Sequence, residues 1–253
     1  ELLKSSGVVA DVASIVSAGV RIVAPGTFFT EHKKIDDVYM AELQHASSLA
    51  PLHVGPMLDE LQQIKKVLPS VTILGISDSA FHNSMPFCAR TYAIPHEDVE
   101  QYDMHRFGYH GISVQSVVRS VNETEGAFPE KTIVCHLGGG SSITALRSGA
   151  SQDTTMGFTP DGGLPMSTRV GTIDAAAVVV LAEKLGDVEK LSEYLNKKSG
   201  LLGVSGCSAD MRVLLDAEAK GDKRSSDAIA LYVYHIQKSI GAFAAVLHGV
   251  DAI

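Results

Sequence analysis

The sequence predicts a mixed α/β protein, because short β-branched segments alternate with longer segments of helical periodicity. The chain has 253 residues, 45% of them hydrophobic and 20% charged, which is typical of a globular protein with a packed core. Residues 20–24 (VRIVA) and 71–77 (VTILGIS) are β-branched runs bounded by glycine or proline, which predicts two buried strands. Residues 132–137 and 142–147 predict two more strands, joined by a glycine turn into a hairpin.

Helices are predicted wherever apolar residues recur on one face. Asp174 and Asp187 stand where a helix N-cap would accept backbone hydrogen bonds. The predicted helices cover residues 36–50, 55–68, 112–121, 174–185, 187–197 and 224–248, with another ending near residue 219. Residues 153–174, rich in glycine and proline, and residues 199–212, rich in glycine and serine, predict two loops. A loop as long as 153–174 in a compact domain is usually functional.

Charge and cysteine content limit the possible partners and compartment. The net charge of −8 argues against a nucleic-acid or membrane-surface binder, because both need a basic face. No segment reaches the roughly 18–20 apolar residues of a membrane helix. Cys88, Cys135 and Cys207 are far apart and form no CxxC motif, so we expect buried free thiols in a reducing, cytoplasmic setting.

Three consecutive glycines, Gly138, Gly139 and Gly140, follow the predicted strand 132–137. They fit neither the dinucleotide fingerprint, which opens a helix, nor a P-loop. Glycines that join two strands and precede Ser141 and Ser142 can expose backbone N–H groups to a phosphate. The alternative is a plain glycine hairpin with serines at its rim.

Five polar residues stand in positions that favour anion chemistry. Asp78 follows a buried strand, where open α/β folds bind ligands, although a turn or cap residue is at least as common there. Arg106 and His110 flank a glycine and could donate to anionic oxygens, or be structural. Arg169 lies isolated in the 153–174 loop, where an arginine is either a surface charge or an anion clamp. Arg21 lies inside an apolar strand, where a buried guanidinium needs an anion or several acceptors. Phosphoryl transfer would use such a set.

Seven segments, in this order, resemble the acetate kinase family and together span nearly the whole chain. They are VRIVAPG (20–26), APLHVGP (50–56), SDSAFHNSMP (77–86), RFGYHGIS (106–113), HLGGGSSI (136–143), DTTMGFTPDGGLPMSTRVGTID (153–174) and SGLLGVSGCSADMR (199–212). The resemblance implies a two-domain actin-like ATPase (ribonuclease H-like) fold, incomplete in this chain. Residues 1–79 would be the remnant of a substrate and phosphate domain, and residues 80–253 a truncated nucleotide-binding domain.

The resemblance further implies reversible, ATP-dependent phosphorylation of a short-chain carboxylate to an acyl phosphate, with acetate as the leading substrate. Mg²⁺ would be the cofactor, and the protein would be a homodimer. The implied catalytic residues are Arg21, Asp78, His110 and Arg169, with Arg21 also holding the substrate. Val23, Leu52 and Pro160 would line the pocket for its alkyl end. The nucleotide would contact His136, Leu137, Gly138, Gly139, Gly140, Asp210, Met211 and Arg212.

The role of Asp78 needs a separate argument. A carboxylate substrate is already ionised near neutral pH, so a general base has little to do in the forward direction. We therefore expect Asp78 to orient metal-bound water or Arg21.

Departures from the family pattern leave alternatives open. Val54, Val114 and Gly139 replace the usual Asn, His and Asn, and residues 24–26 read Ala-Pro-Gly where the family has His-Gly-Gly. Acyl preference, with propionate or butyrate in place of acetate, and the donor, ATP or pyrophosphate, therefore stay open, as does a non-catalytic nucleotide-binding remnant. Both ends look cut, so we expect a fragment that holds no metal ligand and is inactive alone.

Overall fold

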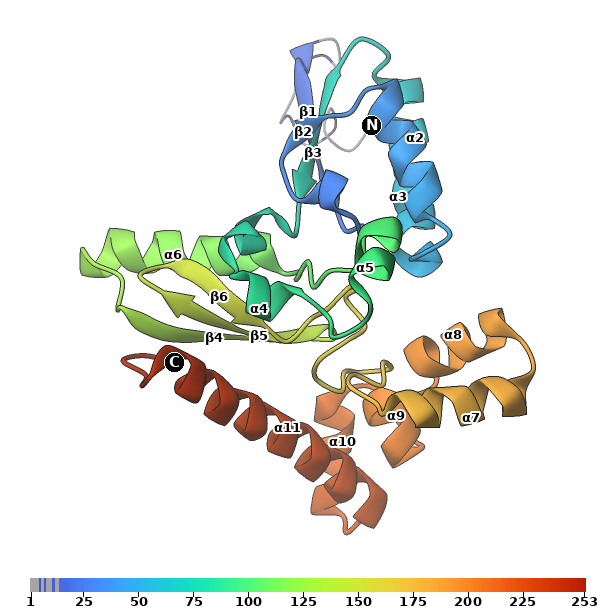
Figure 1. Cartoon of the computed structure of the whole chain (residues 1–253), viewed down its shortest axis with the longest axis vertical. Helices are drawn as coiled ribbons and strands as arrows, with labels where there is room; N and C mark the ends of the chain where they lie inside the picture. Colours follow the sequence, from blue (N-terminus) through green and yellow to red (C-terminus); the bar gives the residue numbers. More distant parts are fainter. Residues whose placement is uncertain (1–4, 6, 8–10, 12–13) are drawn as a thin grey trace.

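Two three-stranded sheets form the framework of the protein (Figure 1). The structure is a computed structural model that describes residues 5, 7, 11 and 14–253, with only the backbone described for residues 51–53. Within this described part, no helix has both the length and the apolar content to cross a bilayer. The mixed α/β class predicted from the sequence is confirmed.

The first sheet has the strand order β1-β3-β2. Strand β1 (Ser17–Ile22) runs parallel to β3 (Thr72–Ser77), and the short β2 (Lys33–Lys34) is antiparallel to β3. The connection from β2 to β3 carries helices α2 (Asp37–Ala46) and α3 (Pro51–Val67). Their apolar faces bury Tyr39, Leu43 and Leu61 against Val20 and Ile22 of β1. Because β1 and β3 are parallel neighbours, their carboxyl ends lie side by side.

The second sheet is antiparallel, with the order β4 (Lys131–Leu137), β5 (Ser141–Arg147) and β6 (Ala150–Thr154). Helix α11 (Lys223–Leu247) covers one face, where Phe243 and Leu247 pack on Ile133 and Ile143. Helix α6 (Gly111–Glu125) lies along the other face (Figure 1). Strand β5 is therefore buried on both faces from Ser141 to Leu146, which explains its nearly continuous apolar and small-residue sequence.

Short helices connect these parts. The segment between the sheets forms η3 (Ala80–Ser84), α4 (Phe87–Arg90) and α5 (His96–Tyr102), and η2 (Thr27–Phe29) follows β1. After the second sheet, α7 (Ala175–Leu185), α8 (Val188–Lys197), α9 (Gly200–Ser205) and α10 (Met211–Ala219) lead to α11. The predicted caps are confirmed: Asp174 Oδ1 accepts from the N–H groups of Ala176 and Ala177, and Asp187 Oδ1 from that of Lys190.

Four predictions from the sequence are wrong in part. The first strand ends at Ile22, not at residue 24, and begins at Ser17. The predicted loop 153–174 starts later, because polar residues up to Thr154 form β6 by pairing with β5. The loop expected over 199–212 contains helix α9, whose Leu201 packs against Leu214. The three cysteines are free, but Cys88 and Cys207 are exposed and Cys135 is only half-buried.

Gly200 holds the loop that carries Arg169. It has a φ of 61°, and a methyl group there would collide with the Met166 carbonyl and lie 2.7 Å from the carbonyl oxygen of Arg169. Gly186 has a φ of 65° with no atom near its missing side chain. Alanine substitutions at Gly200 and Gly186 therefore distinguish the cost of backbone strain from the cost of a steric collision.

We predict that Gly200→Ala destabilises the chain more than Gly186→Ala. Both variants force alanine into the left-handed region, at about 1–2 kcal/mol. Only Gly200→Ala adds a collision, worth about 1–3 kcal/mol more. Denaturant unfolding of the two variants and the parent measures the difference. Equal losses at the two positions would mean that the loop moves aside freely.

Candidate active site

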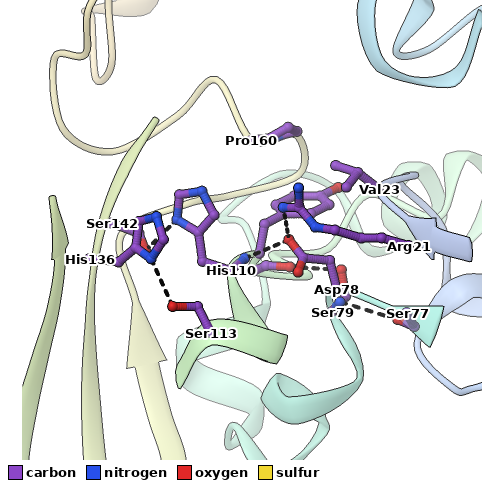
Figure 2. Close-up of polar contacts among 12 residues, drawn as sticks. Arg21, Val23, Ser77, Asp78, Ser79, His110, Ser113, His136, Ser142 and Pro160 are labelled. Carbon is purple, nitrogen blue, oxygen red and sulfur yellow. Dashed lines mark hydrogen bonds and ion pairs between the residues drawn. The ribbon is translucent and has the colours of Figure 1, made fainter. Parts of the chain in front are cut away.

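A buried carboxylate lies where the first sheet meets helix α6. Asp78 follows β3, and its side chain is 1% exposed. Its Oδ2 accepts hydrogen bonds from Arg21 Nη2 of β1, at 2.7 Å, and from the backbone N–H of His110, at 2.8 Å (Figure 2). Its own backbone N–H donates to the Ile22 carbonyl, and its carbonyl accepts from Gly111 N–H. One residue thus joins β1, β3 and α6.

Arg21 differs from the expectation of a guanidinium buried in a strand. It stands one residue before the end of β1, and its side chain is 54% exposed. The ion pair with Asp78 engages one of its N–H groups, and the fork geometry leaves further donors directed away from Asp78. Arg21 is exposed because it lies near the end of β1, where a loop follows the strand.

Two histidine rings stack beside this ion pair. The rings of His110 and His136 are 3.9 Å apart between centroids, at 25° (Figure 2). His110 Nδ1 lies 2.9 Å from Ser142 Oγ, and His136 Nδ1 lies 2.9 Å from Ser113 Oγ. Burial lowers the pKa of His110 to about 4. His136, Arg21 and Arg169 also lower this pKa, whereas Asp78 raises it. His110 is therefore a neutral hydrogen-bonding group at neutral pH.

Arg169 reaches the same place from the loop before α7. A methyl group added at Gly140 would lie 3.4 Å from His110 Nε2 and 3.6 Å from Arg169 Nη1, so both groups border that space. Arg169 Nε lies 3.3 Å from Asp161 Oδ1, and Nη1 donates to the Pro160 carbonyl at 3.4 Å. Arg21, Asp78, His110 and Arg169 thus lie close together in the structure.

Small apolar groups adjoin the ion pair. Val23, half-buried just after β1, packs against the buried cluster of Phe107, Tyr109, Met156 and Met166. Pro160 is buried, and in Figure 2 it lies across from Val23 and Arg21. Leu52 belongs to α3, but its side chain lies outside the described residues.

Six of the eight residues proposed for the nucleotide line one cavity of about 600 Å³, within the usual range for ligand pockets. Leu137, Gly138 and Gly139 form one wall, and Asp210, Met211 and Arg212 at the start of α10 form another. Ser167, Leu201, Ala209 and Tyr232 complete the lining. The other two, His136 and Gly140, do not line the cavity and lie beside His110 instead.

Arg106 does not join this site, and of the two roles that the sequence left open for it the structure shows the structural one. Its Nε donates to the Ala89 carbonyl, and its Nη1 contacts the carbonyls of residues 154–156. Asp153 lies 4.0 Å from it. The guanidinium links α4 to the end of β6 and the residues that follow it. Gly108, the glycine between Arg106 and His110, has no side chain because the His82 ring lies against it. This glycine therefore indicates packing and not ligand binding.

Sequence reasoning missed the side chains that hold the site residues in place. Ser113 and Ser142 contact the two histidine rings, and the Tyr109 hydroxyl donates to the Phe158 carbonyl at 2.7 Å. His82 is fully buried between Ser151 Oγ and the Tyr109 carbonyl. Of these residues, the sequence indicated only Ser142, as a serine at the rim of the glycine turn. The partners are 23 to 69 residues away in the chain, so spacing could not reveal them.

Two cationic side chains and a neutral imidazole thus lie beside a glycine turn that carries no side chains. The chain belongs to the acetokinase family, whose sequence model matches residues 1–253. It is 45% identical to the acetate kinase of Desulforamulus reducens, over 98% of this chain and 63% of that protein. The chain thus spans about 63% of the length of the curated relatives it matches.

Solved structures agree with this assignment. The acetate kinase of Porphyromonas gingivalis superimposes with a TM-score of 0.86 at 36% identity, over 98% of this chain and 64% of that one. A propionate kinase from Francisella tularensis superimposes with a TM-score of 0.90 at 32% identity, over 99% and 64%.

Buried histidines predict acid sensitivity of the fold. Burial lowers the pKa of His82 from 6.5 to about 4, against the raising effects of its hydrogen bond to Tyr109 and of Asp78. Between these values the unfolded chain binds a proton that the folded chain does not. The His82 contribution to stability is therefore complete above about pH 6.5 and is lost as pH falls toward 4.

We predict that the free energy of unfolding falls from pH 7 to pH 4.5 and that His82→Asn flattens this fall. His110 acts in the same direction, so part of the decline remains in the variant. Denaturant titrations at several pH values measure the slope, with the exposed His45→Asn as control. An unchanged slope in His82→Asn would contradict the prediction.

Proposed function

We propose that this protein catalyses the reversible, ATP-dependent phosphorylation of a short-chain carboxylate, with acetate as the leading substrate, to an acyl phosphate. The observation that carries the proposal is the convergence of Arg21, His110 and Arg169 beside Asp78 and the glycine turn. Membership of the acetokinase family supports it. A carboxylate oxygen attacks the terminal phosphorus of ATP, and the bond from that phosphorus to the bridging oxygen of ADP breaks.

Each side chain has a role that follows from charge. Arg21 holds the substrate carboxylate or the phosphoryl group in transfer through the donors that Asp78 leaves unused. Arg169 and the neutral His110 donate to the equatorial oxygens, where charge gathers in the transition state. Asp78 neutralises Arg21 and fixes its direction. Val23 and Pro160 border the alkyl end, and too little space there would exclude larger acids.

The nucleotide would occupy the cavity that Gly138 and Gly139 share with residues 210–212. Its phosphates would approach the turn, and its nucleoside end would lie toward Met211. Asp210 caps α10 and pairs with Arg212, whose hydrogen bonds lower the pKa of Asp210 to about 2. This carboxylate is therefore charged throughout the neutral range, and it orients Arg212 at the rim.

Mg²⁺ fits this chain only as an ion held chiefly by the substrate. Among the described residues no three acidic, histidine or cysteine side chains gather as a metal site. Mg²⁺ commonly binds through one or two carboxylates, waters and phosphates, which requires no such cluster. Asp78 is the carboxylate that would orient its bound water. When bound, the ion would neutralise phosphate charge.

Propionate is the second candidate substrate, favoured by the similarity to a propionate kinase structure. One methylene changes binding by about 1–3 kcal/mol, so a modest change in the pocket decides between the acids. The ratio of kcat/KM values for acetate, propionate and butyrate measures the preference directly.

We predict that Asp78→Asn lowers kcat on the order of 100-fold without changing the shape of its pH profile. The amide keeps the size but no longer neutralises or orients Arg21. Acyl phosphate trapped with hydroxylamine measures turnover, in protein made from the complete reading frame that contains this sequence. Asp187→Asn, which keeps a helix cap, is the control. If the variant lost a limb of the profile, Asp78 would be a general base.

We predict that Gly140→Ala weakens ATP binding by about 10- to 100-fold while the fold is kept, as expected for a methyl group that overfills a site. The added group meets only ordinary contacts with His110 and Arg169. Calorimetric titration with ATP measures affinity, and thermal unfolding checks the fold. Gly241→Ala in α11, where no atom is near, is the matched control. Unchanged affinity would place the phosphates elsewhere.

A further inference from the structure

We propose that Ser142 is a positioning residue that sets the tautomer of His110, by donating its hydroxyl proton to Nδ1 and so keeping the ring proton on Nε2. The catalytic consequence rests on the proposed function, whereas the tautomer itself does not. Nε2 is the ring nitrogen that borders the space between Gly140 and Arg169.

The fold brings Ser142 and His110 together from opposite sides. Ser142 is the cross-strand partner of His136, so it lies beside that ring on the sheet face toward α6. His110 precedes α6 in the left-handed conformation, with a φ of 60°, and its ring lies over His136. Nδ1 of His110 then comes within 2.9 Å of Ser142 Oγ (Figure 2).

The direction of this hydrogen bond follows from the need of a buried hydroxyl proton for an acceptor. Ser142 is 0% exposed, so its hydroxyl proton needs an acceptor within the protein. Among the described residues, His110 Nδ1 is the one hydrogen-bond partner of Ser142 Oγ. If Nδ1 carried the ring proton and donated it, the serine proton would be buried without an acceptor. The hydroxyl therefore donates, and Nδ1 carries a lone pair.

The other histidine of the stack lacks this constraint. Ser113, which contacts His136 Nδ1, is only half-buried, so its hydroxyl can also turn toward water. The Ser113 hydroxyl therefore does not determine which nitrogen of His136 carries the proton. Ser142 and Ser113 thus make similar contacts with different consequences.

The tautomer decides what His110 presents to an anion. A neutral imidazole has one donor and one acceptor nitrogen. With the proton on Nε2, the ring donates toward the space beside Arg169, whereas the other tautomer would direct a lone pair at an anionic oxygen. The lowered pKa of His110 keeps the ring neutral, so a second proton cannot remove the distinction.

The test is ring ¹⁵N spectroscopy of the 253-residue chain, with His110→Gln used to assign the signals. Long-range proton–nitrogen correlations show which nitrogen carries the proton. We expect Nε2 protonated and Nδ1 a hydrogen-bonded acceptor in the parent and in Ser142→Thr, and loss of the acceptor signature in Ser142→Ala. Thr144→Val is the matched control, because Thr144 is an equally buried hydroxyl on the same face of β5 that contacts Thr154.

Turnover measured on the complete reading frame supplies the second readout. We expect Ser142→Ala to lower kcat about 10- to 100-fold with little change in KM for the carboxylate, and Ser142→Thr to restore most of it. A proton on Nδ1 in the parent overturns the proposal, as does Ser142→Ala with the parent spectrum. Absence of acyl phosphate from the parent, with the expected spectrum, instead refutes the proposed function and leaves the tautomer assignment standing.

Discussion

The arrangement of the site depends on the buried carboxylate of Asp78. Its side chain holds Arg21 and the His110 backbone, while its own backbone bonds to Ile22 and Gly111. The residue therefore fixes the end of β1, the end of β3 and the start of α6 relative to one another. A carboxylate that is 1% exposed needs compensation for its lost hydration. A cation and a backbone N–H supply it, and the compensation itself aligns the catalytic candidates.

Charge balance explains how two guanidinium groups can lie near one histidine before any ligand arrives. Arg21 is paired with Asp78, and Arg169 lies beside Asp161. His110 adds no charge, because burial and its neighbours keep its pKa low. Cationic donors are thus held in place with little mutual repulsion. An incoming anion gains from donors that are already oriented, because the cost of ordering them has been met by folding.

Local features of this chain were predictable from sequence, and long-range pairing was not. The caps at Asp174 and Asp187 and the hairpin around the glycine turn rest on contacts within a few residues, and the structure has them. Strand β6 is polar and owes its form to pairing with β5. Helix α9 is glycine-rich, and its Leu201 is buried against α10. The gathering of Arg21 and Arg169 was predicted by family resemblance, since no spacing rule connects residues so far apart.

The glycines of this chain serve two physical purposes, and backbone angles tell them apart. Gly108 and Gly200 have positive φ angles and lie against neighbouring atoms, so the fold itself requires them. Gly138, Gly139 and Gly140 do not have positive φ angles, so the backbone conformation alone does not require glycine there. Only at Gly138 would a methyl group lie tight against the backbone, 3.3 Å from the Gly140 carbonyl oxygen. A side chain at Gly140 would instead fill the space that His110 and Arg169 border. Gly140 is therefore explained by the space that its missing side chain leaves open beside the imidazole and guanidinium donors, and not by a need of the backbone.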